Sequence, residues 1–209
     1  MTLGMNTVFN ISGSNDVSLK ETYERSMRIL DDFFETKWVK NQPKVYVVDS
    51  RATIDSLQGS ETQKWLVGWD AGWSVYVLDR DSFKTDAARM YSNEEYQMLI
   101  THELAHVYFK VAAGGKIEPK WLWEGVSIFV SGQAEVWDKP ENFKSFLDNN
   151  EVYTESGYAI LLLVNKYGKS KLIQLLKQYK VYSGEFTKLF EEVYGFLPSY
   201  ETFNQLMLK

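Results

Sequence analysis

Hydrophobic side chains near the start of the chain recur at helical spacing. Ser18 and Glu21 have the spacing of a capping box, in which the serine caps the helix and the glutamate binds back to it. The positions that follow on one helical face are Tyr23, Met27, Leu30 and Phe34. We therefore predict an amphipathic helix that begins at this box, ends near Trp38 and packs on a sheet.

The pattern changes to that of strands after Pro43. Residues 45–48 are typical of a buried strand, residues 52–57 of a short helix, and residues 64–79 of two strands joined near Asp70-Ala71-Gly72. These segments predict a small mixed sheet. A second capping box, formed by Ser92 and Glu95, then begins a long helix. Its apolar stripe consists of Tyr96, Ile100, Leu104, Val107 and Val111.

The second half of the chain shows only helical patterns from Glu151 onward. They cover residues 154–167, 169–180, 184–194 and 199–208. The expected fold class is α+β, in one domain over residues 1–209. We expect a mixed-sheet lobe in residues 1–113 and a helical lobe in residues 114–209, because Gly114-Gly115 ends the long helix.

The chain has two histidines, and both lie in the middle of the long helix, in His102-Glu103-Leu104-Ala105-His106. This H-E-x-x-H pattern is typical of zinc hydrolases, because a spacing of four places both imidazoles on one helical face. A zinc ion held there acidifies water, and a neighbouring carboxylate can take up the proton. We predict His102 and His106 as metal ligands and Glu103 as the general base.

Zinc that keeps one position open for water needs a third protein ligand. Since the chain has no cysteine and no third histidine, this ligand has to be a carboxylate. Glu124 is the best candidate, because it follows Pro119 on an expected helix whose other side chains are largely apolar. A carboxylate in such a setting needs a cation. The alternative, an exposed glutamate without a ligand role, stays open.

Composition and charge narrow the classes of function. A net charge of −5, a sequence pI of about 5.2 and the lack of a basic run argue against nucleic-acid binding. No stretch reaches the roughly 20 apolar residues of a membrane span, so we expect no transmembrane segment. Residues 1–12 lack the layout of a signal peptide, and a cytoplasmic location is the default expectation.

The two chemical motifs together resemble those of a known family. His-Glu-Leu-Ala-His, followed by Trp-Leu-Trp-Glu-Gly at residues 121–125, is similar to the gluzincin metallopeptidases. This group includes thermolysin-like and aminopeptidase N-like enzymes and small peptidase MA-like domains. Pattern-level likeness extends over residues 43–195. The resemblance implies a zincin-like fold, one zinc ion per chain, and hydrolysis of peptide or protein substrates.

The resemblance also implies roles for individual residues. The three ligands named above match the zinc ligands of the family, and Glu103 matches its general base. Tyr153 matches the tyrosine that stabilises the oxyanion of the tetrahedral intermediate. Tyr158 is an alternative for this role, and a packing role for either tyrosine stays open.

Two departures from the family pattern refine the expectation. The Gly-x-Met-Glu-Asn-like segment, whose glutamate binds a free amino terminus in the aminopeptidase-like branch, is missing, so we expect an endopeptidase rather than an aminopeptidase. Ile128 stands where thermolysin-like enzymes have an aspartate that orients a zinc-bound histidine. Another group has to accept the second imidazole N–H, and Ser127 is a candidate.

The hairpin before the zinc helix bears on substrate binding. Peptidases of the resembled group bind an extended peptide along an exposed edge strand, and Trp73–Val77 is the candidate edge. An interior position of this strand is the alternative. Of Trp65, Trp69 and Trp73, we expect at least two in the core.

Two other classes of function remain open from the sequence. The first is an interaction module that keeps the zinc site without efficient turnover. The second is a zinc hydrolase that acts on a non-peptide bond, since the same ligands activate water toward other electrophiles.

Overall fold

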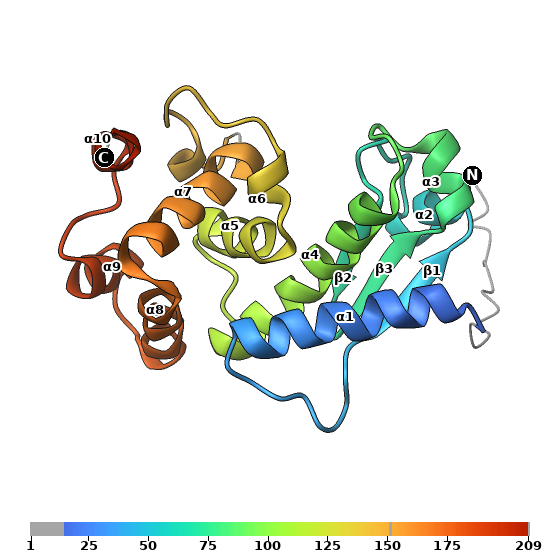
Figure 1. Ribbon diagram of the computed structural model, residues 1–209, viewed down its shortest axis with the longest axis horizontal. Helices are drawn as coiled ribbons and strands as arrows, with labels where there is room; N and C mark the ends of the chain where they lie inside the picture. The colour runs from blue at the N-terminus through green and yellow to red at the C-terminus, as the bar shows by residue number, and fades with distance from the viewer. Residues whose placement is uncertain (1–14, 151, 209) are drawn as a thin grey trace, which may run out of the picture.

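The computed structural model describes residues 15–150 and 152–208 (Figure 1). The expectation for residues 1–12 lies outside this range. The elements, in chain order, are α1 Val17–Phe33, β1 Lys44–Val48, α2 Arg51–Gln58, β2 Gly68–Ala71, β3 Ser74–Leu78, α3 Arg80–Asp86, α4 Asn93–Ala112, α5 Lys120–Ser131, α6 Gln133–Val136, the 3-10 helix η1 Phe146–Asp148, α7 Val152–Tyr167, α8 Lys169–Val181, α9 Phe186–Tyr194 and α10 Tyr200–Met207. A mainly helical chain with one small sheet confirms the α+β class.

The sheet is mixed, as predicted, with the strand order β1-β3-β2. β3 pairs in parallel with β1 and antiparallel with β2. Because β3 is central, the expectation that Trp73–Val77 forms an exposed edge is wrong. Among the described residues, the edge strands of this sheet are β1 and β2. β1 is also less buried than predicted, since the side chain of Val47 is 41% exposed on this edge strand.

Helix α1 is shorter than the sequence pattern indicates. It begins at Val17, and Asp16 rather than Ser18 is its N-cap, because the Asp16 carboxylate accepts a hydrogen bond from the Leu19 N–H at 3.0 Å. Aspartate and serine cap helices about equally well, so position decides between them. The helix ends at Phe33, and Trp38 lies in the loop that follows.

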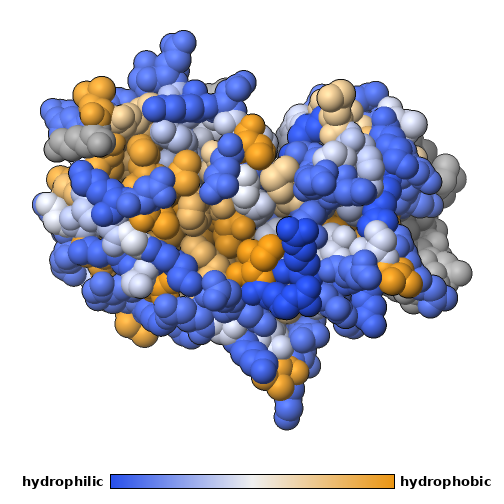
Figure 2. All heavy atoms as spheres, in the orientation of Figure 1, coloured by the Kyte–Doolittle hydropathy of each residue, from blue (hydrophilic) through white to orange (hydrophobic). Residues whose placement is uncertain are grey.

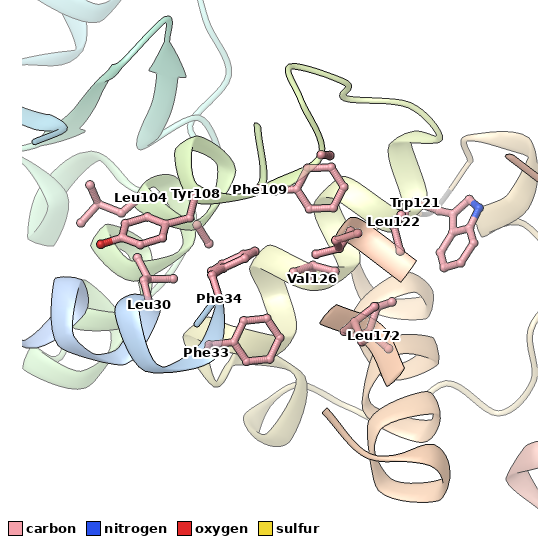
Figure 3. Packing of buried hydrophobic residues seen from close by; sticks show 14 of the residues in the cluster. Leu30, Phe33, Phe34, Leu104, Tyr108, Phe109, Trp121, Leu122, Val126 and Leu172 are labelled. Carbon is pink, nitrogen blue, oxygen red and sulfur yellow. The ribbon is translucent and has the colours of Figure 1, made fainter. Parts of the chain in front are cut away.

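Helix α4 is the centre of the molecule. Its predicted cap is confirmed, since the Ser92 side chain accepts a hydrogen bond from the Glu95 N–H at 3.0 Å. Every residue from Leu99 to Phe109 is buried, so all faces of this part of the helix are covered rather than one apolar stripe. The reason is that α1, α5, α8 and the sheet all pack against it. Figure 3 shows the aromatic and aliphatic side chains that fill the space between α1, α4 and α5.

The remaining helices form the second half of the molecule (Figure 1). α5 and α7 approach closely, because a Cβ atom at Gly157 would lie only 2.3 Å from Cγ2 of Ile128. On the face drawn in Figure 2, hydrophobic residues gather over the helical half, whereas the surface over α1 and the sheet is mainly hydrophilic. Over the residues that the structure describes, none of the helices combines the length and apolar character needed to span a membrane.

Candidate metal centre

A cleft of about 470 Å³ lies where the two halves of the molecule meet. β2 and the segment before it form one side, and side chains of α4, α5, α6 and α7 complete it. All five residues predicted from the sequence line this cleft, namely His102, Glu103, His106, Glu124 and Tyr153. The fold therefore brings residues from three helices to one place.

His102, His106 and Glu124 form a group that could hold a metal ion. One ligand atom of each lies within 4.8 Å of the others. Oε2 of Glu124 is 3.5 Å from Nε2 of His102 and 3.6 Å from Nε2 of His106. This oxygen is buried and has no hydrogen-bond partner among the described residues. A buried carboxylate oxygen between two imidazole nitrogens is the arrangement that a bound cation would satisfy.

The other nitrogen of each imidazole is held by a buried polar side chain. Ser127 donates its hydroxyl proton to the Trp123 carbonyl at 3.0 Å, so its oxygen accepts from Nδ1 of His106 at 2.9 Å. The amide oxygen of Gln133 accepts from Nδ1 of His102 at 2.8 Å. Both contacts place the proton on Nδ1 and leave the lone pair of Nε2 directed at Glu124. The structure thus bears out the expected contact of Ser127.

Gln133 is the residue of the site that sequence reasoning missed. It begins α6, directly after Gly132, whose φ of 89° ends α5 and turns the chain back toward α4. A glycine at a helix end signals a turn, but it does not tell which later side chain returns to the cleft. Gln133 is 2% exposed, in keeping with its buried contact with His102.

Burial and neighbouring charges shift the titration of the cleft residues. Burial raises the pKa of Glu103 to about 7, and the charges of Glu124 and Asp70 act in the same direction. Burial lowers the pKa of His106 well below its ordinary value, with help from His102 and Lys110. For His102 burial also lowers the pKa, but the Glu124 carboxylate and the charge of Glu103 outweigh it, and the net pKa is raised.

Glu103 is held against the edge strand β2. A Cβ atom at Gly68 would lie 3.0 Å from both Cγ and Oε1 of Glu103, so any other residue there would require this carboxylate to shift. Glu103 is 7% exposed and lines the same cleft as the three possible ligands. Its position suits a group that accepts a proton from a molecule in the cleft.

The structure separates the two tyrosines of α7. Tyr153 lines the cleft and is 42% exposed. Burial raises its pKa to about 12, with contributions from Glu124 and Glu103, so its hydroxyl keeps its proton at neutral pH. Tyr158 lies one to two turns further along and stacks on Phe143, with ring centroids 6.1 Å apart. Of the two, Tyr153 is the one that can donate a hydrogen bond into the cleft.

Two ion pairs neutralise the other charges at the cleft. Lys110 of α4 pairs with Asp70 of β2, and Arg89 pairs with Glu95 at 2.7 Å. Asp70 also lies near Glu103 and His106 as a second group of possible ligands, but its pairing with the Lys110 ammonium already supplies a cation.

The tryptophans are distributed differently from the sequence expectation. Trp65 is 58% exposed and Trp73 is 57% exposed, so the expectation that at least two of the three lie in the core is wrong. Both occupy turns next to β2 rather than strand positions. Trp69 is partly buried and stacks on Tyr76 of β3.

Comparisons with known proteins add no assignment. No family model, no curated protein and no solved structure matches this chain.

Proposed function

We propose that this protein is a zinc-dependent metallopeptidase of the gluzincin type with a zincin-like fold. The observation that carries the proposal is the buried, unpartnered Oε2 of Glu124 between the two imidazoles. Ligands about 2.0–2.2 Å from a tetrahedral ion lie about 3.3–3.6 Å from one another. The observed separations of 3.5 and 3.6 Å fit this value, and two histidines with one glutamate are a set of catalytic zinc ligands.

The chemistry divides among the residues of the cleft. Zinc bound by His102, His106 and Glu124 supplies Lewis acidity, which acidifies water and polarises a carbonyl group. Glu103 accepts the proton of the attacking water and returns it to the leaving amine. Tyr153 donates a hydrogen bond to the oxyanion that develops at the attacked carbonyl. Ser127 and Gln133 hold the two imidazoles in the tautomer whose Nε2 atom can bind a metal ion.

The charges of the cleft favour cleavage within a chain. A free amino or carboxyl terminus needs an unpaired charge of opposite sign, but Asp70 is paired with Lys110 and Arg89 with Glu95. The remaining charged side chains of the described lining belong to the metal set and Glu103. In addition, the open edge of β2 borders the cleft and can pair with an extended peptide. We therefore assign an endopeptidase.

The test compares zinc content and peptide cleavage in three proteins. We expect the wild type to bind about one zinc per chain and to cleave members of a blocked peptide library. Glu103→Gln should keep the zinc but lose about 10²- to 10⁴-fold in rate, because the proton acceptor is gone. Glu94→Gln, an exposed change at the start of the same helix, is the matched control and should behave like the wild type.

Two results would contradict the proposal. Cleavage by Glu103→Gln at the wild-type rate would remove the assigned mechanism. A wild type that binds zinc and cleaves no peptide of the library would remove the function itself, and ester and amide substrates would then be the next compounds to assay.

A further inference from the structure

Indole rings line an unusual share of the cleft. Four of the seven tryptophans of the chain line it: Trp65, Trp69, Trp123 and Trp137. Two of them have identified structural contacts, since Trp123 packs on His106 with ring centroids 4.1 Å apart and Trp69 stacks on Tyr76 at 4.9 Å. The other two, Trp65 and Trp137, stack on no other aromatic ring among the described residues. Their rings are the ones left for a ligand.

The turn that carries Trp65 is braced by hydrogen bonds although Trp65 itself is 58% exposed. The Arg51 guanidinium of α2 donates hydrogen bonds to the carbonyls of Gln63 at 3.1 Å and Leu66 at 2.6 Å, on either side of Trp65. Arg51 is fixed in turn by an ion pair with Asp86 at 3.2 Å. An aromatic ring on a rigid support loses little conformational entropy when it binds a ligand.

Trp137 comes from the other half of the molecule and has a similar support. The backbone N–H of Trp137 donates to the Gln133 carbonyl at 3.0 Å, which closes α6. Gln133 itself is buried and bonded to His102, so the α6 turn that ends at Trp137 begins at a residue held at the candidate metal centre. The exposed Trp65 and the partly buried Trp137 thus belong to separate segments, and both line the cleft that contains Glu103.

We propose that Trp65 and Trp137 form a subsite that selects substrates with a bulky apolar or aromatic side chain beside the scissile bond. The inference rests on the proposed function and specifies its substrate class. With Asp70 paired to Lys110 and Arg89 to Glu95, the described lining outside the candidate metal ligands and Glu103 has no free charge to attract a charged side chain. The volume of about 470 Å³ lies within the range of roughly 300–1,000 Å³ for ligand pockets, so a large side chain fits beside the backbone.

The experiment uses a series of peptides blocked at both ends that differ at one residue next to the cleaved bond, with Phe, Leu, Gly, Asp or Lys there. Cleavage is measured as kcat/KM with the zinc-loaded wild type. Binding is measured separately as Kd with zinc-loaded Glu103→Gln and fluorescently labelled peptides. We expect the wild type to favour Phe and Leu over Gly, Asp and Lys in both measurements.

The variants are Trp65→Ala and Trp137→Ala, with Trp65→Phe to test for rescue. In each alanine variant, kcat/KM should fall about 10- to 100-fold for the Phe peptide and less than about threefold for the Gly peptide. Trp65→Phe should regain most of the preference. Trp73→Ala is the matched control, because Trp73 is 57% exposed and lies outside the cleft lining. Zinc content and melting temperature verify that all variants fold.

The outcomes distinguish the two proposals. If both alanine variants keep the wild-type ratio between the Phe and Gly peptides, or if Trp73→Ala loses it equally, the subsite is refuted. If the peptides bind with the expected preference and are never cleaved, the subsite stands and the peptidase assignment fails. If the wild type cleaves all five peptides equally well, the enzyme stands and the subsite fails.

Discussion

Each imidazole of the candidate metal centre uses one nitrogen in a buried hydrogen bond. Ser127 lies three residues after Glu124 on α5, so one helix supplies both a candidate ligand and the hydrogen-bond partner of another candidate ligand. Gln133 plays the same part for His102 with a neutral amide oxygen. Outer partners of this kind are worth about 10- to 100-fold in metal affinity. With both protons fixed on Nδ1, the two Nε2 atoms face Glu124 without a change of tautomer.

Tyr153 provides the sharpest prediction for a single residue. Tyr153→Phe removes the hydroxyl that can stabilise the oxyanion, and we expect kcat to fall about 10²- to 10³-fold with little change in zinc content or KM. Steady-state kinetics on one peptide substrate measures this. Tyr158→Phe is the control on the same helix and should retain the wild-type kcat, since its ring stacks on Phe143. A larger loss in Tyr158→Phe than in Tyr153→Phe would reverse the assignment.

The grouping of the candidate site residues could be predicted from the sequence because the H-E-x-x-H spacing fixes the geometry of both histidines directly. His102 and His106 share a helical face in any regular helix. Ser127 lies on the same helix that the sequence predicts for Glu124. Gln133 was not accessible, since it reaches His102 only through the turn at Gly132. The partner of a buried histidine depends on tertiary packing, which no local pattern records.

At the level of elements, the contact between α5 and α7 sets the distance between Glu124 and Tyr153. Gly125 and Gly157 both lie in this contact, where a Cβ atom at either position would be under 3.0 Å from the facing helix. Small residues let two helix backbones approach, and here the approach places a tyrosine of one helix beside the ligand of the other. The contact therefore has a role in positioning as well as in stability.

Gly157→Ala tests this contact. The added methyl group would meet Cγ2 of Ile128 at 2.3 Å, so we expect a loss of about 1–3 kcal/mol in the free energy of unfolding. Ile128→Ala alone should also destabilise, because it leaves a cavity. The double variant should lose less than the sum of the two, by about 0.5–3 kcal/mol, since the cavity accepts the methyl group. Urea unfolding measures all three, and strict additivity would show that the two residues do not compete for space.

The elements themselves were largely predictable, and their neighbours in space were not. Residues 45–48, 52–57 and the helices after residue 151 agree with the structure within a few positions. The sequence could not place β3 in the centre of the sheet, because a hairpin does not specify which of its strands receives a third. The N-cap of α1 was misassigned for a local reason, as Asp16 and Ser18 offer competing caps two residues apart.

On the scale of the whole molecule, the cleft joins the sheet half to the helical half. Residues of β2 and α4 form one part of its lining, and residues of α5, α6 and α7 form the other. Within the metal set, His102 and His106 come from α4 and Glu124 from α5. A metal ion bound by this set would tie α4 to α5, and its removal would leave Oε2 of Glu124 buried without a partner among the described residues.

This linkage predicts a dependence of thermal stability on zinc. At a free zinc concentration about 100-fold above Kd, binding to the folded state alone adds about 2.7 kcal/mol, which corresponds to about 5–11 °C in melting temperature for a chain of this size. When zinc is added back to wild-type protein that has been stripped with a chelator, the melting temperature should rise by this amount. Glu124→Ala should show little response, because one ligand is missing, whereas Glu192→Ala, an exposed change on α9, should respond fully. Differential scanning calorimetry measures these responses. An equal response in Glu124→Ala and wild type would place the stabilising metal elsewhere. The reason is that loss of Glu124 removes one of three candidate ligands, and the two histidines of α4 alone do not bridge to α5.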